Sequence, residues 1–253
     1  LLIADLVLDL KFDNRKWLDY CKKRFTRFIV EKNHKSHFKI AVQILRSRSY
    51  KDIRIRYLSA TASEIFFPDS IRHFQYLNFT IKNSLAGMLL SKNRGMIHAS
   101  GVAIDHKAYL FVGKSGAGKS TAAKLAGGKI LADDRSIFRI IEDRVYIYGS
   151  PFPEANPFPK QNGRYELGAI FLLRKAGATA TIICKPVTKK YSLFKLLPHA
   201  VIRDEAPAEE KQQQIIRVFH LCRKLAENTP VYTLSYDAKK KDSLRQWLRQ
   251  NFG

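Results

Sequence analysis

The 253-residue sequence predicts a mixed α/β fold, in which a mixed-sheet P-loop domain follows a small basic α+β portion. Three observations predict this class. Short apolar segments of strand length alternate with glycine turns from residue 97 onward. A motif of the form G-x-x-x-x-G-K-[ST] stands between one such segment and a helix-forming one. Longer helical patterns flank these segments, so we expect helices packed on a sheet. We divide the chain into a basic α+β portion at 1–90 and a P-loop domain at 91–253.

The N-terminal portion is expected to contain both helices and strands. Its predicted elements are strand 1–10, helix 14–30, strands 38–45, 53–58 and 65–67, and helix 70–91. In helix 14–30 the apolar residues recur at helical spacing, while lysines and arginines fill the opposite face. Helix 70–91 has Asp69 or Ser70 as its N-cap and could pack against either portion, so the boundary is approximate.

The P-loop domain is expected to have shorter elements. They are strands 97–104, 108–112, 129–132, 137–141, 144–148, 168–174, 179–184 and 231–235, and helices 121–126, 207–227 and 238–250. The segment 149–163 contains four prolines and is longer than an ordinary connection. It predicts either a lid that positions a substrate, with Ser150 and Glu154 as contacts, or a plain surface loop.

The composition is that of a globular protein with a strong positive charge. Hydrophobic residues make up 45% of the chain, and 45 Lys+Arg against 22 Asp+Glu give a formal net charge of +23. Such a field attracts polyanions. Residues 22–56 hold twelve lysines and arginines against Glu31 and Asp52, and a second basic cluster lies at 239–249. Three interpretations stay open: a solvated basic surface, recognition of an acidic peptide or protein, and nucleic-acid binding.

The cysteines and the N-terminal segment indicate the compartment. Cys21, Cys184 and Cys222 lie far apart, with no CxxC pair and no histidine at metal-ligand spacing, which argues against a zinc site or a disulfide framework. Residues 1–10 contain two aspartates and lack a basic segment, so they predict a strand and not a signal peptide. No stretch approaches the ~18 apolar residues that span a bilayer. We therefore expect a cytoplasmic protein without a membrane span.

Residues 113–120, with the sequence GKSGAGKS, match G-x-x-x-x-G-K-[ST] at every fixed position. The glycines allow successive backbone N–H groups to converge on phosphate oxygens. Lys119 would reach the β- and γ-phosphates, and the Ser120 hydroxyl would complete a Mg²⁺ shell. The motif therefore predicts ATP and Mg²⁺ as cofactors. The residues expected to contact the nucleotide are Gly113, Ser115, Gly116, Ala117, Gly118, Lys119, Ser120 and Thr121.

Two adjacent acids follow only 14 residues beyond Lys119. The predicted strand 129–132 would deliver Asp133 and Asp134 to the phosphate site. Adjacent carboxylates can divide the work, one facing a metal and the other accepting a proton. The alternative is a solvated turn in which Arg135 forms an ion pair with the acids. His98, on the strand expected to pair with the P-loop strand, is either a core histidine or a contact of the acids or of phosphate.

These motifs together resemble the catalytic domain of HPr kinase/phosphorylase. The likeness rests on the segment HASGVAI at 98–104, the P-loop and Ala132-Asp133-Asp134, in the same order, and covers roughly 85–175. The chain also resembles HPr-kinase-like enzymes, some of which phosphorylate serine on ribosomal precursor peptides. Those enzymes often carry a Thr/Ser-Pro-Trp/Phe loop after the acidic pair, and Ser150-Pro151-Phe152 resembles that loop. The resemblance implies the P-loop mixed sheet of the HPr kinase/carboxykinase type.

The resemblance also implies roles for single residues. Lys119 and Ser120 would hold the triphosphate and Mg²⁺, Asp133 would take the proton of the acceptor hydroxyl, and Asp134 would support it or bind the metal. His98 would lie beside the base. The family's Leu-Glu-x-Arg-Gly signature is absent, and Glu166 is out of register with it. Neither the reverse phosphorolytic reaction nor HPr as the substrate is therefore inferred.

The sequence thus predicts an ATP-dependent kinase that phosphorylates a hydroxyl, most simply a serine of a peptide, protein or small molecule. Three alternatives stay open: a nucleic-acid-associated P-loop ATPase, a nucleotide-binding regulator without transfer chemistry, and a carboxykinase-like enzyme. The absence of an N-K-x-D signature argues against a GTPase. The oligomeric state is left open.

Overall fold

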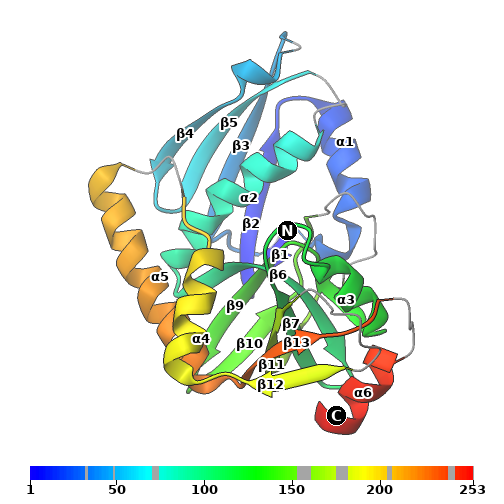
Figure 1. Ribbon diagram of the computed structural model, residues 1–253. Helices are drawn as coiled ribbons and strands as arrows, with labels where there is room; N and C mark the ends of the chain where they lie inside the picture. Colours follow the sequence, from blue (N-terminus) through cyan, green and yellow to red (C-terminus); the bar gives the residue numbers. More distant parts are fainter. Residues whose placement is uncertain are drawn as a thin grey trace.

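The computed structural model of the protein describes residues 1–31, 34–47, 49–69, 74–152, 161–174, 182–203, 207–238 and 243–252. These residues form two mixed β-sheets with helices packed against them (Figure 1). The mixed α/β class that the sequence predicts is confirmed. Within the described ranges, no helix is long and apolar enough to cross a membrane.

The first sheet has five strands in the order β1-β2-β3-β5-β4. Its elements and the helices between them are β1 (Leu2–Ile3), β2 (Leu6–Phe12), α1 (Arg15–Arg24), η1 (Thr26–Phe28), β3 (Phe38–Leu45), η2 (Tyr50–Asp52), β4 (Arg54–Ser59) and β5 (Ala62–Pro68). Strands β2, β3 and β5 run parallel, and β1 and β4 are antiparallel additions at the edges. The predicted strand 1–10 is divided because Ala4 and Asp5 adopt positive φ in a tight turn.

Helix α1 begins at an Asn14 cap, whose side chain accepts a hydrogen bond from the Trp17 amide at 3.3 Å. The helix ends at Arg24, earlier than predicted, and the single turn η1 follows. Trp17 is fully buried, and its indole donates to the Asp69 carboxylate at 3.0 Å. Asp69 thus binds α1, while Ser70, the other candidate cap of the next helix, lies outside the described residues.

The second sheet has eight strands, and β6 runs through its middle. The order is β10-β9-β6-β7-β11-β13-β12, and β8 also pairs with β6. The elements are α2 (Phe74–Leu90), β6 (Arg94–Ile104), β7 (Lys107–Val112), α3 (Lys119–Leu125), β8 (Lys129–Ala132), β9 (Arg135–Ile141), β10 (Arg144–Tyr148), β11 (Arg164–Leu173), β12 (Ile183–Pro186), α4 (Lys189–Leu196), η4 (Leu197–His199), α5 (Ala208–Asn228), β13 (Val231–Ser235) and α6 (Ser243–Phe252). Strands β7, β11 and β13 are parallel, and the remaining pairings are antiparallel.

Helices cover both faces of the second sheet. Successive residues of a strand point to opposite faces, and β7 shows the consequence. Its Leu110 belongs to the buried cluster that includes Leu196 of α4 and Leu225 of α5. Its Phe111 belongs to the cluster that includes Leu248 of α6 and the buried alanines of α3. Helices α4 and α5 therefore lie on one face, and α3 and α6 on the other.

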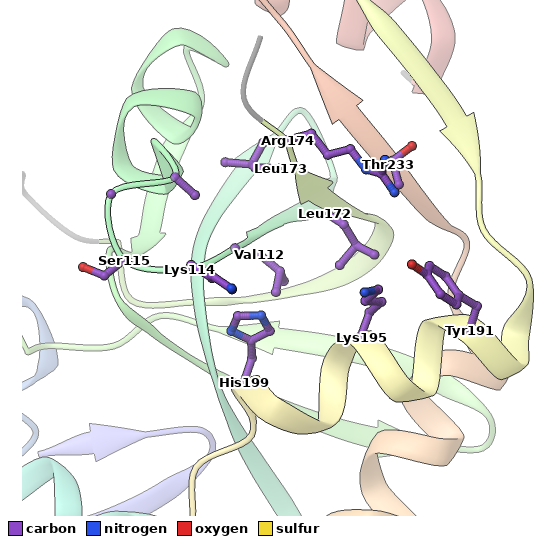
Figure 2. A pocket seen from close by; sticks show the side chains of 13 residues that line it. Val112, Lys114, Ser115, Leu172, Leu173, Arg174, Tyr191, Lys195, His199 and Thr233 are labelled. Atoms are coloured by element: carbon purple, nitrogen blue, oxygen red, sulfur yellow. The ribbon is translucent and has the colours of Figure 1, made fainter. Parts of the chain in front are cut away.

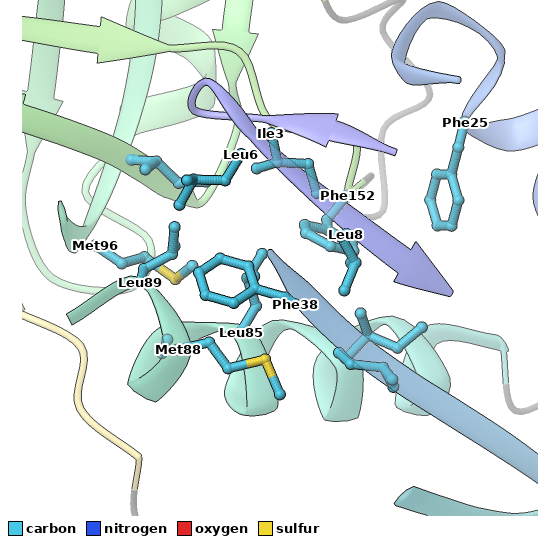
Figure 3. Packing of buried hydrophobic residues seen from close by; sticks show 14 of the residues in the cluster. Ile3, Leu6, Leu8, Phe25, Phe38, Leu85, Met88, Leu89, Met96 and Phe152 are labelled. Atoms are coloured by element: carbon cyan, nitrogen blue, oxygen red, sulfur yellow. The ribbon is translucent and has the colours of Figure 1, made fainter. Parts of the chain in front are cut away.

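Helix α2 packs against both sheets. One buried cluster contains Leu8 and Phe38 of the first sheet, Leu85 and Leu89 of α2, and Met96 of β6 (Figure 3). The helix has contacts with both β5 and β6. It therefore joins the basic portion to the P-loop domain across the expected boundary after residue 90.

Some predicted features lie outside the described residues. These are 153–160 in the proline-rich segment, 179–181 at the start of a predicted strand, and the lysines at 239–241. The described part of that strand, β12, begins at Ile183. Helix α4 was not predicted at all.

Candidate functional site

The glycine-rich motif forms the loop 113–118 between β7 and α3. Gly116 and Gly118 have φ values of 76° and 87°, in the left-handed region that other residues rarely adopt. A Cβ at Gly113 would lie 2.9 Å from the Cβ of Ala117. The backbone of this loop therefore favours glycine at 113 and 118, the two glycines that the motif fixes, and also at 116.

The Lys119 amine lies across this loop. Its Nζ donates hydrogen bonds to the carbonyl oxygens of Gly113, at 3.0 Å, and Lys114, at 3.2 Å. These neutral acceptors can be exchanged for phosphate oxygens, which form stronger, charge-assisted bonds with an ammonium group. Ser120 is half-buried next to Lys119, and Thr121 is exposed.

A cavity of about 630 Å³ opens beside the loop (Figure 2). Residues 112–117 form one wall, and Tyr191 and Lys195 of α4 form another together with His199 of η4. The remaining lining residues are Leu172, Leu173, Arg174 and Thr233. Lys114, Arg174 and Lys195 make the cavity positively charged, which suits a polyphosphate.

The lining residues beyond the P-loop were missed by the sequence analysis. Tyr191, Lys195 and His199 belong to α4 and η4, and α4 has only eight residues without a strong apolar stripe. The sequence feature that could have predicted α4 is Thr188. Its side chain accepts a hydrogen bond from the Tyr191 amide at 3.4 Å and caps the helix. Arg174 follows the end of β11 and gave no local signal.

The acidic pair lies at the same edge of the sheet as the P-loop. Val112, the last residue of β7, is opposite Ala99 in β6. The Ala99 amide donates to the Asp134 carbonyl, at 2.9 Å, on the other side of β6. Because neighbouring strands lie about 4.8 Å apart, the backbones at Val112 and Asp134 are about 10 Å apart. The structure therefore brings the P-loop and the two acids together.

Asp134 lies among three basic side chains. Its carboxylate is 3.7 Å from Lys82 Nζ, 3.5 Å from His98 Nδ1 and 3.7 Å from Arg135 Nε. Burial by itself would raise the pKa of this carboxyl group. The hydrogen bond from His98 and the charges of Lys82, His98 and Arg135 outweigh it and lower the pKa to about 2.

Lys82 and Asn83 connect α2 to this cluster, and no sequence motif predicted them. The Lys82 side chain is 5% exposed. The Asn83 side-chain oxygen accepts a hydrogen bond from Arg135 at 2.7 Å. The signal was Lys82 itself, the one charged residue of α2, because a lysine is rarely buried without a partner.

Asp133 has a different environment from Asp134. The residue is only 5% exposed, and its carbonyl accepts a hydrogen bond from the Ser100 hydroxyl. In the part of the chain that the structure describes, no basic group lies within ion-pair distance of its carboxylate. His98 lies beside Asp134 and not beside Asp133 as expected, because the register of β6 with β9 pairs His98 with Arg135.

The site fits a nucleoside triphosphate better than a protein-bound metal ion. A Cβ at Gly116 would meet no atom within 4 Å, so the mouth of the loop is open to a ligand. Asp134 does not fit as a metal ligand, because basic groups already surround its carboxylate. Among the described residues, no three His, Cys, Asp or Glu side chains are grouped to hold a metal. Ser120 is the residue that would approach a nucleotide-bound Mg²⁺.

The segment proposed as a lid is described only at its ends. Glu154 lies outside the described residues. The Ser150 amide donates to the Leu131 carbonyl and the Gln161 amide to the Ile130 carbonyl, each at 2.9 Å, so both ends run along β8. Ser150 is buried, at 3% exposure.

Comparison with known proteins gives structural similarity but no match to a protein-family model or to a curated protein. Among solved structures, the fold is similar to that of the Hpr(Ser) kinase/phosphatase from Coxiella burnetii. The TM-score is 0.35 and the sequence identity 12%, over 62% of this chain and 94% of that chain.

Proposed function

We propose that this protein is an ATP-dependent kinase of the HPr-kinase-like type, which transfers the γ-phosphoryl group to a hydroxyl. One observation carries the proposal: a complete P-loop opens on a basic cavity at the sheet edge where Asp133 and Asp134 emerge. A P-loop alone indicates nucleotide binding. The acids next to it add the proton acceptor that transfer to a hydroxyl requires.

The chain's own residues divide into nucleotide-binding and proton-accepting groups. The amides of the loop 113–118 and the Lys119 amine would hold the phosphates, and Lys119 would neutralise charge that develops during transfer. Arg174 and Lys195 add positive charge to the same cavity. ATP, when bound with Mg²⁺, supplies the phosphoryl group, and Ser120 would approach the ion.

Asp133 is the better candidate for the base. Asp134 is held in its charged form by Lys82, His98 and Arg135, and a carboxylate with a pKa near 2 has little affinity for a proton at neutral pH. Asp133 has no such neighbours in the described structure. We assign Asp134 the role of fixing the position of its neighbour, through the peptide bond that they share.

The proposed transfer needs no reactant other than ATP and the acceptor hydroxyl. The acceptor oxygen forms a bond to the γ-phosphorus while the bond from that phosphorus to the β,γ-bridging oxygen breaks. The bridging electron pair leaves on ADP, and the hydroxyl proton passes to Asp133. The acceptor class that we propose is a serine of an acidic peptide or protein, or a hydroxylated small molecule, in the cytoplasm.

Separating binding from transfer tests this proposal. The full chain and its variants are incubated with γ-labelled ATP, Mg²⁺ and a fractionated host extract, and nucleotide affinity is measured in parallel by calorimetry. Asp133→Asn should lower label transfer by about 100-fold or more and change nucleotide affinity by less than about threefold. Lys119→Ala should weaken nucleotide binding about tenfold or more.

Asp19→Asn serves as the matched control, because Asp19 is exposed on α1. It should change neither quantity. Transfer by Asp133→Asn at the wild-type rate would overturn the assignment of the base. Nucleotide binding without transfer by any fraction would indicate the regulator without transfer chemistry instead.

A further inference from the structure

His199 lies in the cavity next to the P-loop, although no motif points to it. It ends η4 and lines the same cavity as the loop residues 113–117. Figure 2 shows its ring between the helix that carries it and the Lys114 side chain. The imidazole is therefore placed to touch a ligand that occupies the loop.

The backbone around His199 is fixed to the central strand of the sheet. Ala200 forms a bridge with Ile97 of β6, and the Val201 amide donates to the Met96 carbonyl at 2.8 Å. His98 follows Ile97 in that strand, so the two histidines approach each other from adjoining backbones. His199 thus lies between the P-loop and the strand that contacts the acidic pair.

The charges around His199 are positive. Burial, followed by the charges of Lys119 and His98, lowers the pKa of the imidazole below its ordinary value of 6.5. Lys114, Arg174 and Lys195 line the cavity with it, and the charges of Lys119 and of His98 of β6 act on the ring. At neutral pH the ring is uncharged and carries one N–H donor.

We propose that His199 donates a hydrogen bond to the terminal phosphate of the nucleotide on the P-loop and thereby distinguishes a triphosphate from a diphosphate. This inference rests on the proposed function. In the proposed complex the terminal phosphate would lie near Lys119, and Lys119 and His98 are the two groups whose charges act on His199. A neutral donor adds a directed bond to a cavity that already has ample positive charge.

Calorimetric titration with two nucleotides tests the contact. The Mg²⁺ complexes of the β,γ-imido analogue of ATP and of ADP are titrated into the full chain and into His199→Ala and His199→Phe, whose side chains carry no hydrogen-bond donor. Loss of one hydrogen bond to a charged phosphate should weaken binding of the imido analogue about tenfold. Binding of ADP should change by less than about twofold. His106→Ala, at an exposed turn, is the control and should change neither affinity.

A second measurement does not depend on a substitution. The ring proton signal of His199 is followed by NMR from pH 5 to 8, with and without the imido analogue. A phosphate at the ring stabilises the charged imidazole, so the pKa should rise on addition of the imido analogue and rise less with ADP.

The outcomes separate this inference from the proposed function. Equal losses for both nucleotides, or no loss in either His199 variant, would overturn the contact while leaving the kinase proposal intact. An unchanged His199 titration in the saturated protein would do the same. Failure of the wild-type chain to bind either nucleotide would overturn the proposed function, and the His199 contact with it.

Discussion

Asp133 and Asp134 show how two adjacent carboxylates acquire different chemistry. Asp134 faces Lys82, His98 and Arg135, which favour its charged form. Asp133 is more deeply buried, and no basic side chain of the described residues lies within ion-pair distance of it. At the residue scale, the environment and not the residue type therefore separates the proposed proton acceptor, Asp133, from Asp134.

Asp134→Asn should destabilise the protein in a pH-dependent way. The substitution leaves Lys82 and Arg135 without their carboxylate, and we expect a loss of about 2 kcal/mol at pH 7, less than for a fully buried pair because Asp134 is partly exposed. The folded-state pKa of about 2 lies below the ordinary 3.8. The stabilisation is therefore present above about pH 4 and is lost as the pH falls through about 2.

Urea unfolding of wild type and variant at pH 7 and at pH 2 measures this difference. The gap in unfolding free energy should shrink at the lower pH. Equal stability at pH 7 would contradict the described role of the cluster.

Strand β6 organises the site at the scale of elements. It pairs with the P-loop strand on one side and with β8 and β9, which flank the acids, on the other. It also contributes His98, and its Ile97 forms a β-bridge with Ala200, the residue that follows η4. The position of the acids relative to the P-loop therefore depends on how closely β8 approaches β6.

Two glycine variants test that dependence. A Cβ at Gly128 would lie 2.2 Å from the Ala103 carbonyl oxygen, whereas a Cβ at Gly116 would meet nothing within 4 Å. Gly128→Ala should push β8 away from β6 and lower the unfolding free energy by about 1–3 kcal/mol. Gly116→Ala, which has only the strain of a positive φ, should lose about 1–2 kcal/mol and chiefly weaken nucleotide binding.

Denaturant unfolding and nucleotide titration of the two variants measure both effects. A Gly128→Ala protein with wild-type stability would show that β8 is free to move.

The whole molecule combines two sheets through α2 and a buried arginine. Arg203 is 2% exposed, pairs with Glu210 of α5, and its guanidinium lies 3.7 Å from the centre of the Tyr57 ring in the first sheet. Lys82 of α2 reaches Asp134 in the second part of the chain. The basic portion is therefore continuous with the site and not an independent appendage.

Local patterns predicted the fold class, the P-loop and most strands, because these depend on short-range periodicity and on glycines at fixed spacing. The remaining parts of the site depend on contacts between distant segments. Lys82 and Asp134 are 52 residues apart, and His199 is positioned by the pairing of Ala200 and Val201 with β6. The short helix α4 gave too few residues for a helical pattern to stand out.

The net charge of +23 is also a property of the whole molecule. Part of this positive charge lies around the candidate nucleotide site, on Lys114, Lys119, Arg174 and Lys195. The larger share lies elsewhere and leaves open whether the molecule binds an acidic acceptor or a nucleic acid. The two cases differ in the destination of the γ-phosphate.

The fate of that phosphate is the most direct measurement. The full chain is incubated with γ-labelled ATP and Mg²⁺, alone, with acceptor fractions from the host, or with DNA or RNA. A kinase should release ADP only with the acceptor fraction, and the label should be recovered in a phosphoester on the acceptor. Release of the label as inorganic phosphate, stimulated by nucleic acid and weakened steeply by salt, would contradict the account and indicate a nucleic-acid-dependent ATPase.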